Sequence, residues 1–157
     1  MVSLNWVRDD IDDLNLIRKL FTDYQKELGI DLCFQGFEGE LPNLPHPYAE
    51  PIGALLLLKF GETAAGCGAL KQLKSDSVEL KRLYIAPEFR QMGLAREICG
   101  LLISKAKEIG YQWMYLDTLD TLTKAIQLYE SIGFEPTDPY NDSGGHRVRY
   151  FRLNLRD

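Results

Sequence analysis

The sequence has few of the residues that build metal centres or disulfide frameworks. Its 157 residues include two histidines, His46 and His146, and three cysteines, Cys33, Cys67 and Cys99, with no Cys-x-x-Cys pair. Zinc sites need closely spaced Cys and His ligands, and disulfide-rich domains need an even set of cysteines. We therefore expect no metal centre and no disulfide, and free thiols favour a cytoplasmic location.

Long apolar runs and basic blocks are also missing. The longest apolar run, Ala54 to Leu58, is far shorter than the roughly 20 residues that span a bilayer, and Met1 to Arg8 lacks a signal-peptide pattern. The net charge is -5 and no cluster of Lys and Arg stands out, which disfavours nucleic acid as the main partner. We expect neither a membrane nor a nucleic-acid partner, and the mild acidity is compatible with an amine substrate.

The pattern of apolar residues predicts one domain, residues 1–157, that alternates strands and helices. Asp10 can cap a first helix that Gly29 ends, and a proline-rich irregular stretch follows. Strands are expected at 4–8, 53–60, 64–70, 78–85, 113–117 and 148–155, and further helices at 93–109 and 121–132. This order predicts a mixed sheet with helices on both faces, and a right-handed crossover that makes 78–85 and 113–117 parallel.

The turn Arg90-Gln91-Met92-Gly93-Leu94-Ala95 joins a predicted strand to a predicted helix. The first amide groups of a helix have no partner within it, and the helix dipole adds positive charge there. A phosphate group can satisfy both needs, and Gly93 lets a ligand approach the backbone. The turn lacks Gly-Lys-Ser/Thr and a full Gly-x-Gly-x-x-Gly, so neither a P-loop nor a dinucleotide site is indicated. An ordinary strand-to-helix turn is the alternative.

Three stretches together resemble the GNAT superfamily of acetyl-CoA-dependent N-acetyltransferases. They are the turn 90–95, the preceding Arg82-Leu83-Tyr84-Ile85-Ala86-Pro87, and Ala125-Ile126-Gln127-Leu128-Tyr129-Glu130-Ser131-Ile132-Gly133-Phe134. The resemblance implies an α/β (α+β) fold, with a mixed, mostly antiparallel central sheet flanked by helices and a splayed parallel strand pair. The sequence departs from the family pattern at Ala95, where a second glycine is common. It also departs at Leu122, where the family often has an asparagine that contacts the cofactor.

The resemblance also implies which residues bind acetyl-CoA, the co-substrate. The backbone around the turn would hold the pyrophosphate, and the gap between the splayed strands would hold the pantetheine arm. The implied cofactor-binding residues are Leu83, Tyr84, Ile85, Arg90, Gln91, Met92, Gly93, Leu94, Ala95, Arg96 and Thr118. For Arg96, an exposed side chain in solvent is an equally good interpretation.

Two residues are the implied catalytic groups. Tyr129 would donate a proton to the departing CoA thiolate, since a phenol with a pKa of about 10 is protonated at neutral pH. Glu79 is the first candidate for the base that removes a proton from the amine, and Asp117 is the second. Strand alternation puts Glu79, Lys81, Leu83 and Ile85 on one face, opposite Leu80, Arg82 and Tyr84. A core tyrosine and surface carboxylates are the structural alternatives.

The acceptor amine is not identified by these motifs. The variable segments Phe34–Glu50 and Tyr140–His146 are expected to select it, with Tyr140 and Asn141 bordering the pocket. The acidic residues Glu38, Glu40 and Glu50 can attract a cationic amine or be solvated loop carboxylates. The final strand is a candidate homodimer contact. A non-catalytic acyl-CoA-binding sensor is the alternative to an enzyme that transfers the acetyl group directly in a ternary complex.

Overall fold

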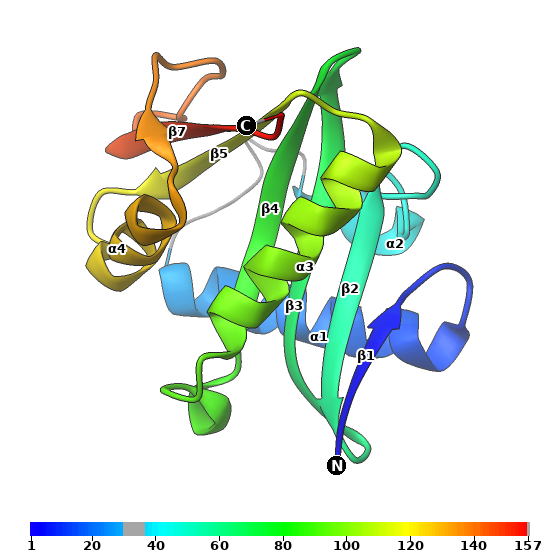
Figure 1. Cartoon of the computed structure of the whole chain (residues 1–157). Helices are drawn as coiled ribbons and strands as arrows, with labels where there is room; N and C mark the ends of the chain where they lie inside the picture. The colour runs from blue at the N-terminus through cyan, green and yellow to red at the C-terminus, as the bar shows by residue number, and fades with distance from the viewer. Residues whose placement is uncertain (30–36, 157) are drawn as a thin grey trace.

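The chain folds around one seven-stranded sheet (Figure 1). The computed structural model describes residues 1–29 and 37–156. The strands are β1 (Val2–Trp6), β2 (Ala54–Phe60), β3 (Thr63–Lys74), β4 (Ser77–Ile85), β5 (Trp113–Leu119), β6 (Glu135–Pro136) and β7 (Val148–Asn154). Their order is β1-β2-β3-β4-β5-β7-β6, and all neighbours are antiparallel except β4 and β5. The predicted mixed sheet and its parallel pair are confirmed.

Helices cover both faces of this sheet, as the order of elements predicts. They are α1 (Ile11–Leu28), α2 (Phe37–Asn43), α3 (Leu94–Ile109) and α4 (Thr123–Ile132). Asp10 caps α1 by accepting a hydrogen bond from the amide of Asp13, and Gly29 ends it with a φ of 69°. The proline-rich stretch holds the short α2, and the described residues 1–29 and 37–156 contain no helix long and apolar enough to cross a membrane.

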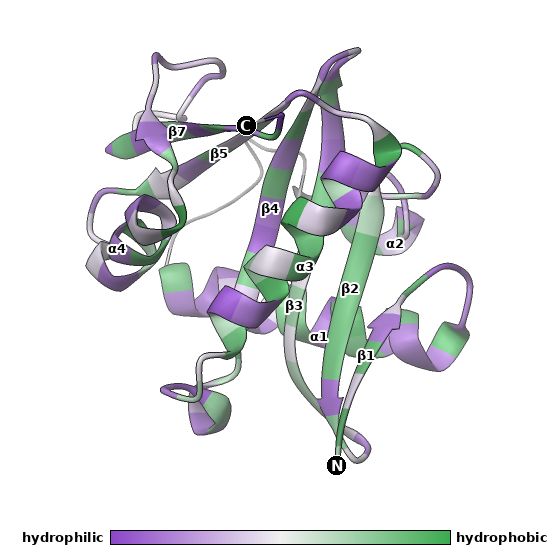
Figure 2. Ribbon diagram, in the orientation of Figure 1, coloured by the Kyte–Doolittle hydropathy of each residue, from purple (hydrophilic) through white to green (hydrophobic). Residues whose placement is uncertain are grey.

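The sheet separates two apolar cores. Leu56 and Leu58 of β2 point into a core with α3 and α4, whereas Leu55 and Leu57 point into a second core with α1. All four leucines are almost completely buried, which explains why β2 has no polar face (Figure 2). Phe151 of β7 is also fully buried, in the α3 and α4 core. The homodimer contact predicted at this final strand stays a prediction.

The parallel pair β4 and β5 separates after three residue pairs. Ser77 lies opposite Trp113, and Glu79, opposite Tyr115, forms the last pair. Beyond that point β4 remains paired with β3 and β5 with β7, so the two strands diverge (Figure 1). Glu79 therefore lies where the gap between the strands opens.

The predicted alternation along β4 is wrong beyond Lys81, because the strand contains a β-bulge. Arg82 has a φ of 58°, and the register with β3 shifts so that Arg82 and Leu83 share one position opposite Gly68. The Cys67 thiol donates to the Arg82 carbonyl at 3.3 Å. As a result Leu83 packs in the α3 and α4 core and Arg82 points to the opposite face, together with Lys81.

Candidate active site

The predicted phosphate-binding turn leads into the N-terminus of α3. After a 3-10 turn (Pro87–Phe89), Gln91 and Gly93 both adopt the left-handed conformation, with φ values of 65° and 77°. The first intrahelical bond runs from the Glu97 amide to the Gly93 carbonyl, and within the described residues no side chain caps the helix. The amide groups of residues 94–96 therefore face outward and can bind an anion.

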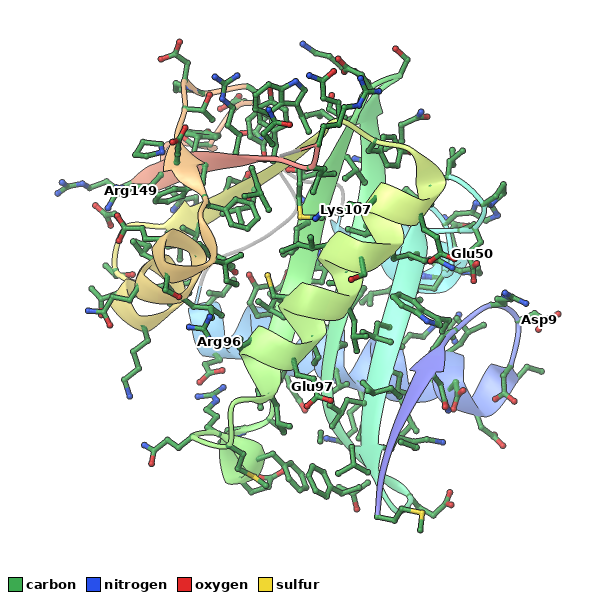
Figure 3. The ribbon with its side chains drawn as sticks, in the orientation of Figure 1. Asp9, Glu50, Arg96, Glu97, Lys107 and Arg149 are labelled. Atoms are coloured by element: carbon green, nitrogen blue, oxygen red, sulfur yellow. The ribbon has the colours of Figure 1, made fainter. Side chains whose placement is uncertain are left out.

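The two arginines beside this turn bind protein groups. Arg90 forms an ion pair with Glu27 at the end of α1, with Nη1 2.7 Å from Oε1, and its Nε donates to the Ile85 carbonyl at 2.9 Å. Arg96 lies near the start of α3 and donates to the Ser131 hydroxyl on α4 at 2.7 Å (Figure 3). The backbone, rather than these side chains, is the main feature of the turn.

The strand residues predicted to bind the cofactor divide between the two faces. Leu83 and Ile85 pack in the core with α3, whereas Tyr84 packs in the α1 core, with its ring centroid 5.7 Å from that of Tyr24. Thr118 lies across the gap on β5, paired with Arg149 of β7. These positions border the gap, and their contact with a cofactor stays a prediction.

Tyr129 lies on the buried side of α4, and 6% of its surface is exposed. Its ring packs against Phe134, with centroids 5.7 Å apart. Burial raises the pKa of the Tyr129 phenol, and the nearby Tyr24, Cys99 and Asp117 raise it further. These neighbours come from α1, α3 and β5, and the phenol is protonated at neutral pH.

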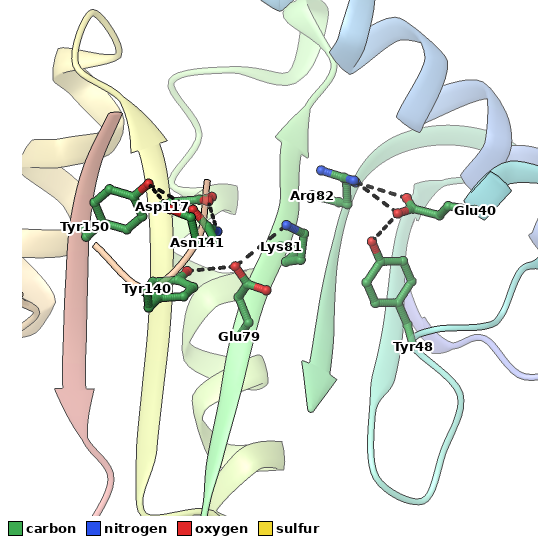
Figure 4. A network of polar contacts seen from close by, with 9 residues as sticks. All are labelled: Glu40, Tyr48, Glu79, Lys81, Arg82, Asp117, Tyr140, Asn141 and Tyr150. Atoms are coloured by element: carbon green, nitrogen blue, oxygen red, sulfur yellow. Dashed lines mark hydrogen bonds and ion pairs between the residues drawn. The ribbon is translucent and has the colours of Figure 1, made fainter. Parts of the chain in front are cut away.

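Glu79 and the loop before β7 form one side of a polar network (Figure 4). The Tyr140 hydroxyl donates to Glu79 Oε2 at 2.7 Å, and Lys81 Nζ lies 3.7 Å from the same oxygen. Glu79 is 3% exposed. The ring of Tyr140 packs between Tyr115 and Tyr150, at centroid distances of 5.4 and 5.2 Å. The predicted border residue Tyr140 thus touches the first candidate base directly.

Asp117, the second candidate base, has a different environment. Its Oδ2 accepts a hydrogen bond of 2.8 Å from the Asn141 side-chain amide. The Tyr150 hydroxyl donates to Asn141 Oδ1 at 2.9 Å, which fixes the orientation of that amide. Asp117 and Asn141 therefore tie the 137–147 loop to β5 (Figure 4).

Arg82, Glu40 and Tyr48 form the other side of the network. The Arg82 guanidinium binds both Glu40 oxygens, each at 3.0 Å, and the Tyr48 hydroxyl donates to Glu40 Oε1 at 2.6 Å. The side chains of Arg82 and Glu40 are 3% and 4% exposed. This bidentate pair connects α2 to the bulge of β4.

Two of the three acidic residues expected near the acceptor, Glu40 and Glu50, bind cations of the protein, and the side chain of the third, Glu38, lies outside the described part of the structure. Glu40 is buried against Arg82, and Glu50 forms ion pairs with Arg8 at 2.8 Å and Lys105 at 3.3 Å, near the C-terminal part of α3 (Figure 3). Residues 34–36 of the predicted acceptor segment lie outside the described residues. Cations neutralise these two carboxylates, so neither is a solvated loop charge.

A pocket of about 330 Å³ lies between α2 and the sheet, next to this network. Its lining residues are Gly39, Glu40, Asn43, His46, Pro47, Tyr48, Lys71 and Lys81. Sequence reasoning did not identify Lys71, Lys81, Arg82 or Tyr48. The adjacent charges Lys81 and Arg82 in a predicted strand were the available signal, because charged side chains in a buried strand need partners inside the protein.

The thiols and metal-ligand types give no second site in the described part of the chain. Cys67 and Cys99 are buried and free, and burial raises the pKa of Cys99 to about 12. Cys33 lies outside the described residues. Among residues 1–29 and 37–156, no three His, Cys, Asp or Glu side chains gather as metal ligands do.

Comparison with known proteins finds acetyltransferases by family and by sequence. Residues 16–134 match the model of the acetyltransferase (GNAT) family. An uncharacterized N-acetyltransferase of Schizosaccharomyces pombe is 38% identical, over 98% of this chain and 95% of its own length. The uncharacterized N-acetyltransferase YjgM of Escherichia coli is 31% identical, over 83% of this chain and 79% of its own length.

Solved structures share the fold at lower sequence identity. A GNAT-family acetyltransferase from Staphylococcus aureus has a TM-score of 0.80 at 20% identity, covering 98% of this chain and 99% of the other. The structure of yncA from Salmonella typhimurium, which holds its cofactor acetyl-CoA, has a TM-score of 0.71 at 18% identity, covering 100% and 95%.

Proposed function

The chain belongs to the acetyltransferase (GNAT) family, and on this premise we propose that it transfers an acetyl group from acetyl-CoA to a primary amine in a ternary complex. Its family membership makes it an acyltransferase. The acceptor in this proposal is a small molecule or a peptide. The observation that carries the proposal is the position of Glu79 at the point where β4 and β5 diverge, with Tyr129 buried on α4.

The residues present fit acetyl-CoA. The uncapped amides of α3 suit a pyrophosphate, and the diverging strands leave the backbone of β4 beyond Glu79 without a β5 partner. The bound co-substrate supplies the thioester that the amine attacks. Gln91, Gly93 and the backbone of residues 94–96 are the proposed phosphate ligands, whereas Arg90 contributes through its bonds to Glu27 and Ile85.

Glu79 is the proposed base because its carboxylate is buried and held in place. Most amines carry an extra proton at neutral pH, so the attacking nitrogen must lose one. Glu79 accepts it at a carboxylate oxygen that Tyr140 orients by its 2.7 Å hydrogen bond. Asp117 bonds to the Asn141 amide in an exposed contact and is the second choice.

Tyr129 is the proposed acid. Formation of the new C–N bond breaks the C–S bond, and the leaving sulfur then needs a proton. The raised pKa of Tyr129, caused mainly by burial, keeps its hydroxyl proton in place at neutral pH. The phenol donates this proton to the sulfur and is restored by the second proton that the nitrogen loses as the amide forms, while the proton held on Glu79 returns to solvent.

Thiol release measured with acetyl-CoA and a panel of amines tests the function. We expect release that depends on both the amine and the enzyme, and none with acetyl-CoA alone, since transfer is direct. Acetyl-CoA binding by calorimetry without release for any amine would instead indicate a binding module.

The choice of base is tested with Glu79→Gln and Asp117→Asn. We expect the first to lower kcat/KM by about 100-fold, a typical contribution of general base catalysis, and the second to have a much smaller effect. The reverse ranking, with acetyl-CoA affinity unchanged in both variants, would assign the base to Asp117.

A further inference from the structure

The pocket between α2 and the sheet has a positive character that an amine acceptor alone does not explain. Its lining includes two lysines, Lys71 of β3 and Lys81 of β4, and one carboxylate, Glu40. Both Glu40 oxygens are already bound, by Arg82 and by the Tyr48 hydroxyl. Lys81 in turn lies 3.7 Å from Glu79 Oε2, so the two lysines together exceed that one carboxylate by a single positive charge.

The two lysines point into the pocket from neighbouring strands. Lys71 pairs with Glu79 across β3 and β4, and Lys81 pairs with Ala69, so the lysines are diagonal neighbours on one face. Long side chains in this arrangement can meet. Lys81 is 8% exposed, and burial lowers its pKa; Glu79 and Asp117 raise it, whereas Arg82 and Lys71 lower it further. An anion between two such lysines would stabilise both charges.

This charged pocket is adjacent to the proposed base. Lys81 Nζ lies 3.7 Å from Glu79 Oε2, and Lys71 faces Glu79 in the strand register. A ligand whose anionic group is bound by the lysines can therefore place an amine, a few bonds away in the same molecule, beside Glu79. The volume, about 330 Å³, is at the lower end of the range of about 300 to 1,000 Å³ for small-molecule sites.

We propose that the acceptor is an amino acid, whose carboxylate binds between Lys71 and Lys81 while its amine is presented to Glu79. This inference rests on the proposed function, and it names the substrate class. The carboxylate accepts charge-assisted hydrogen bonds from the two ammonium groups, which orients the amine towards the base. The pocket therefore selects against polyamines and simple alkylamines, contrary to the expectation of an acidic acceptor loop.

The experiment compares matched acceptors that differ in a single group. For several side chains, the free amino acid, its carboxamide and the corresponding decarboxylated amine are assayed by thiol release. Values of kcat/KM are calculated on the concentration of unprotonated amine, which removes differences in amine pKa. We expect the amino acid to exceed the carboxamide by about tenfold or more, as for hydrogen bonds to charged groups.

Variants of Lys71 link this preference to the pocket. Lys71→Met should bring the ratio of amino acid to carboxamide close to one, and Lys71→Arg should retain most of it. Lys74→Met is the matched control, because Lys74 is an exposed lysine on the same strand outside the pocket, and it should leave the ratio unchanged. Thermal unfolding and acetyl-CoA affinity, both expected to be unaltered, verify that each variant is folded.

The possible results separate this inference from the function on which it rests. Acetyl transfer that shows no preference for the carboxylate, or a preference that Lys71→Met leaves intact, overturns the inference and leaves the transferase function standing. Absence of transfer to every amine, in a protein that binds acetyl-CoA, overturns the function and the inference together.

Discussion

The proposed donor side and the proposed acceptor side of this protein are built in different ways. The donor side is a turn followed by a helix N-terminus, with backbone amides of residues 94–96 and left-handed residues Gln91 and Gly93. The acceptor side is a set of buried charged side chains from β3, β4, α2 and the loop before β7. A short continuous segment makes the first, and distant segments must come together to make the second.

This difference predicts how well each side tolerates the replacement of a side chain. The backbone site depends on local conformation, so many side chains around it can be replaced while the amides stay in place. The acceptor network depends on matched charges in a region of low exposure, where losing one partner leaves the other uncompensated. We expect single substitutions on the acceptor side to lower mainly the stability of the protein. Substitutions on the donor side should lower mainly the affinity for the cofactor.

The largest effect on stability is expected at the Arg82–Glu40 pair. Glu40→Gln should lower the free energy of unfolding by about 3 kcal/mol, because it leaves the buried guanidinium without its counter-charge. Urea denaturation measures this loss. Tyr48→Phe, which removes only the neutral hydroxyl bound to Glu40, is the matched control and should cost about 1 kcal/mol. Equal effects of the two variants would contradict the importance of charge in the network.

The next effect is on turnover. Tyr129→Phe should reduce kcat by about 100-fold or more, as expected for loss of a general acid, with acetyl-CoA affinity unchanged. Steady-state thiol release across pH gives the measurement. Tyr111→Phe removes a hydroxyl that donates to the Ile52 carbonyl and is not part of the proposed active site, so it should leave kcat unaltered. Unchanged turnover in Tyr129→Phe at every pH would remove the acid role.

A smaller effect is expected at the turn. Gly93 has a φ of 77°, and a Cβ added there would meet no atom within 4 Å, so Gly93→Ala introduces backbone strain without a clash. We expect a loss of about 1 kcal/mol in stability and weaker acetyl-CoA binding by calorimetry. Gly100→Ala in α3 also meets no atom, and it should stabilise the helix without altering affinity. Equal affinities in both variants would show that the turn does not hold the donor.

The smallest effect concerns the exposed pair of Arg90 and Glu27. The hydrogen bond from Arg90 lowers the pKa of Glu27, so the pair stabilises the fold above the unfolded-state pKa of about 4.3 and is lost as pH falls through the lower folded value. Glu27→Gln should cost about 0.5 kcal/mol at pH 7, since both side chains are partly exposed. The difference from the parent should vanish in unfolding curves at acid pH; a constant difference would exclude the ion pair as its cause.

Sequence reasoning predicted most of the sheet and the turn before α3, because these depend on local patterns. Apolar periodicity located α1, α3 and α4, whereas anion binding at the start of α3 stays a prediction. It did not predict the face of Arg82, since the bulge arises from a register shift that alternation does not reveal. Nor did it pair Glu40 with Arg82, which lie 42 residues apart and meet only in the folded chain.

The bulge at Arg82 also divides β4 into two segments whose side-chain alternation is offset by one residue. Before it, Lys81 lines the pocket and Glu79 contacts Lys81 and Tyr140, and after it Leu83 and Ile85 pack in the core with α3. Removing one residue here would restore regular alternation, but it would exchange the faces of every later side chain up to the end of β4. The extra residue therefore keeps Val78, Leu80, Leu83 and Ile85 together in the α3 and α4 core, while Lys81 and Arg82 both lie on the opposite face.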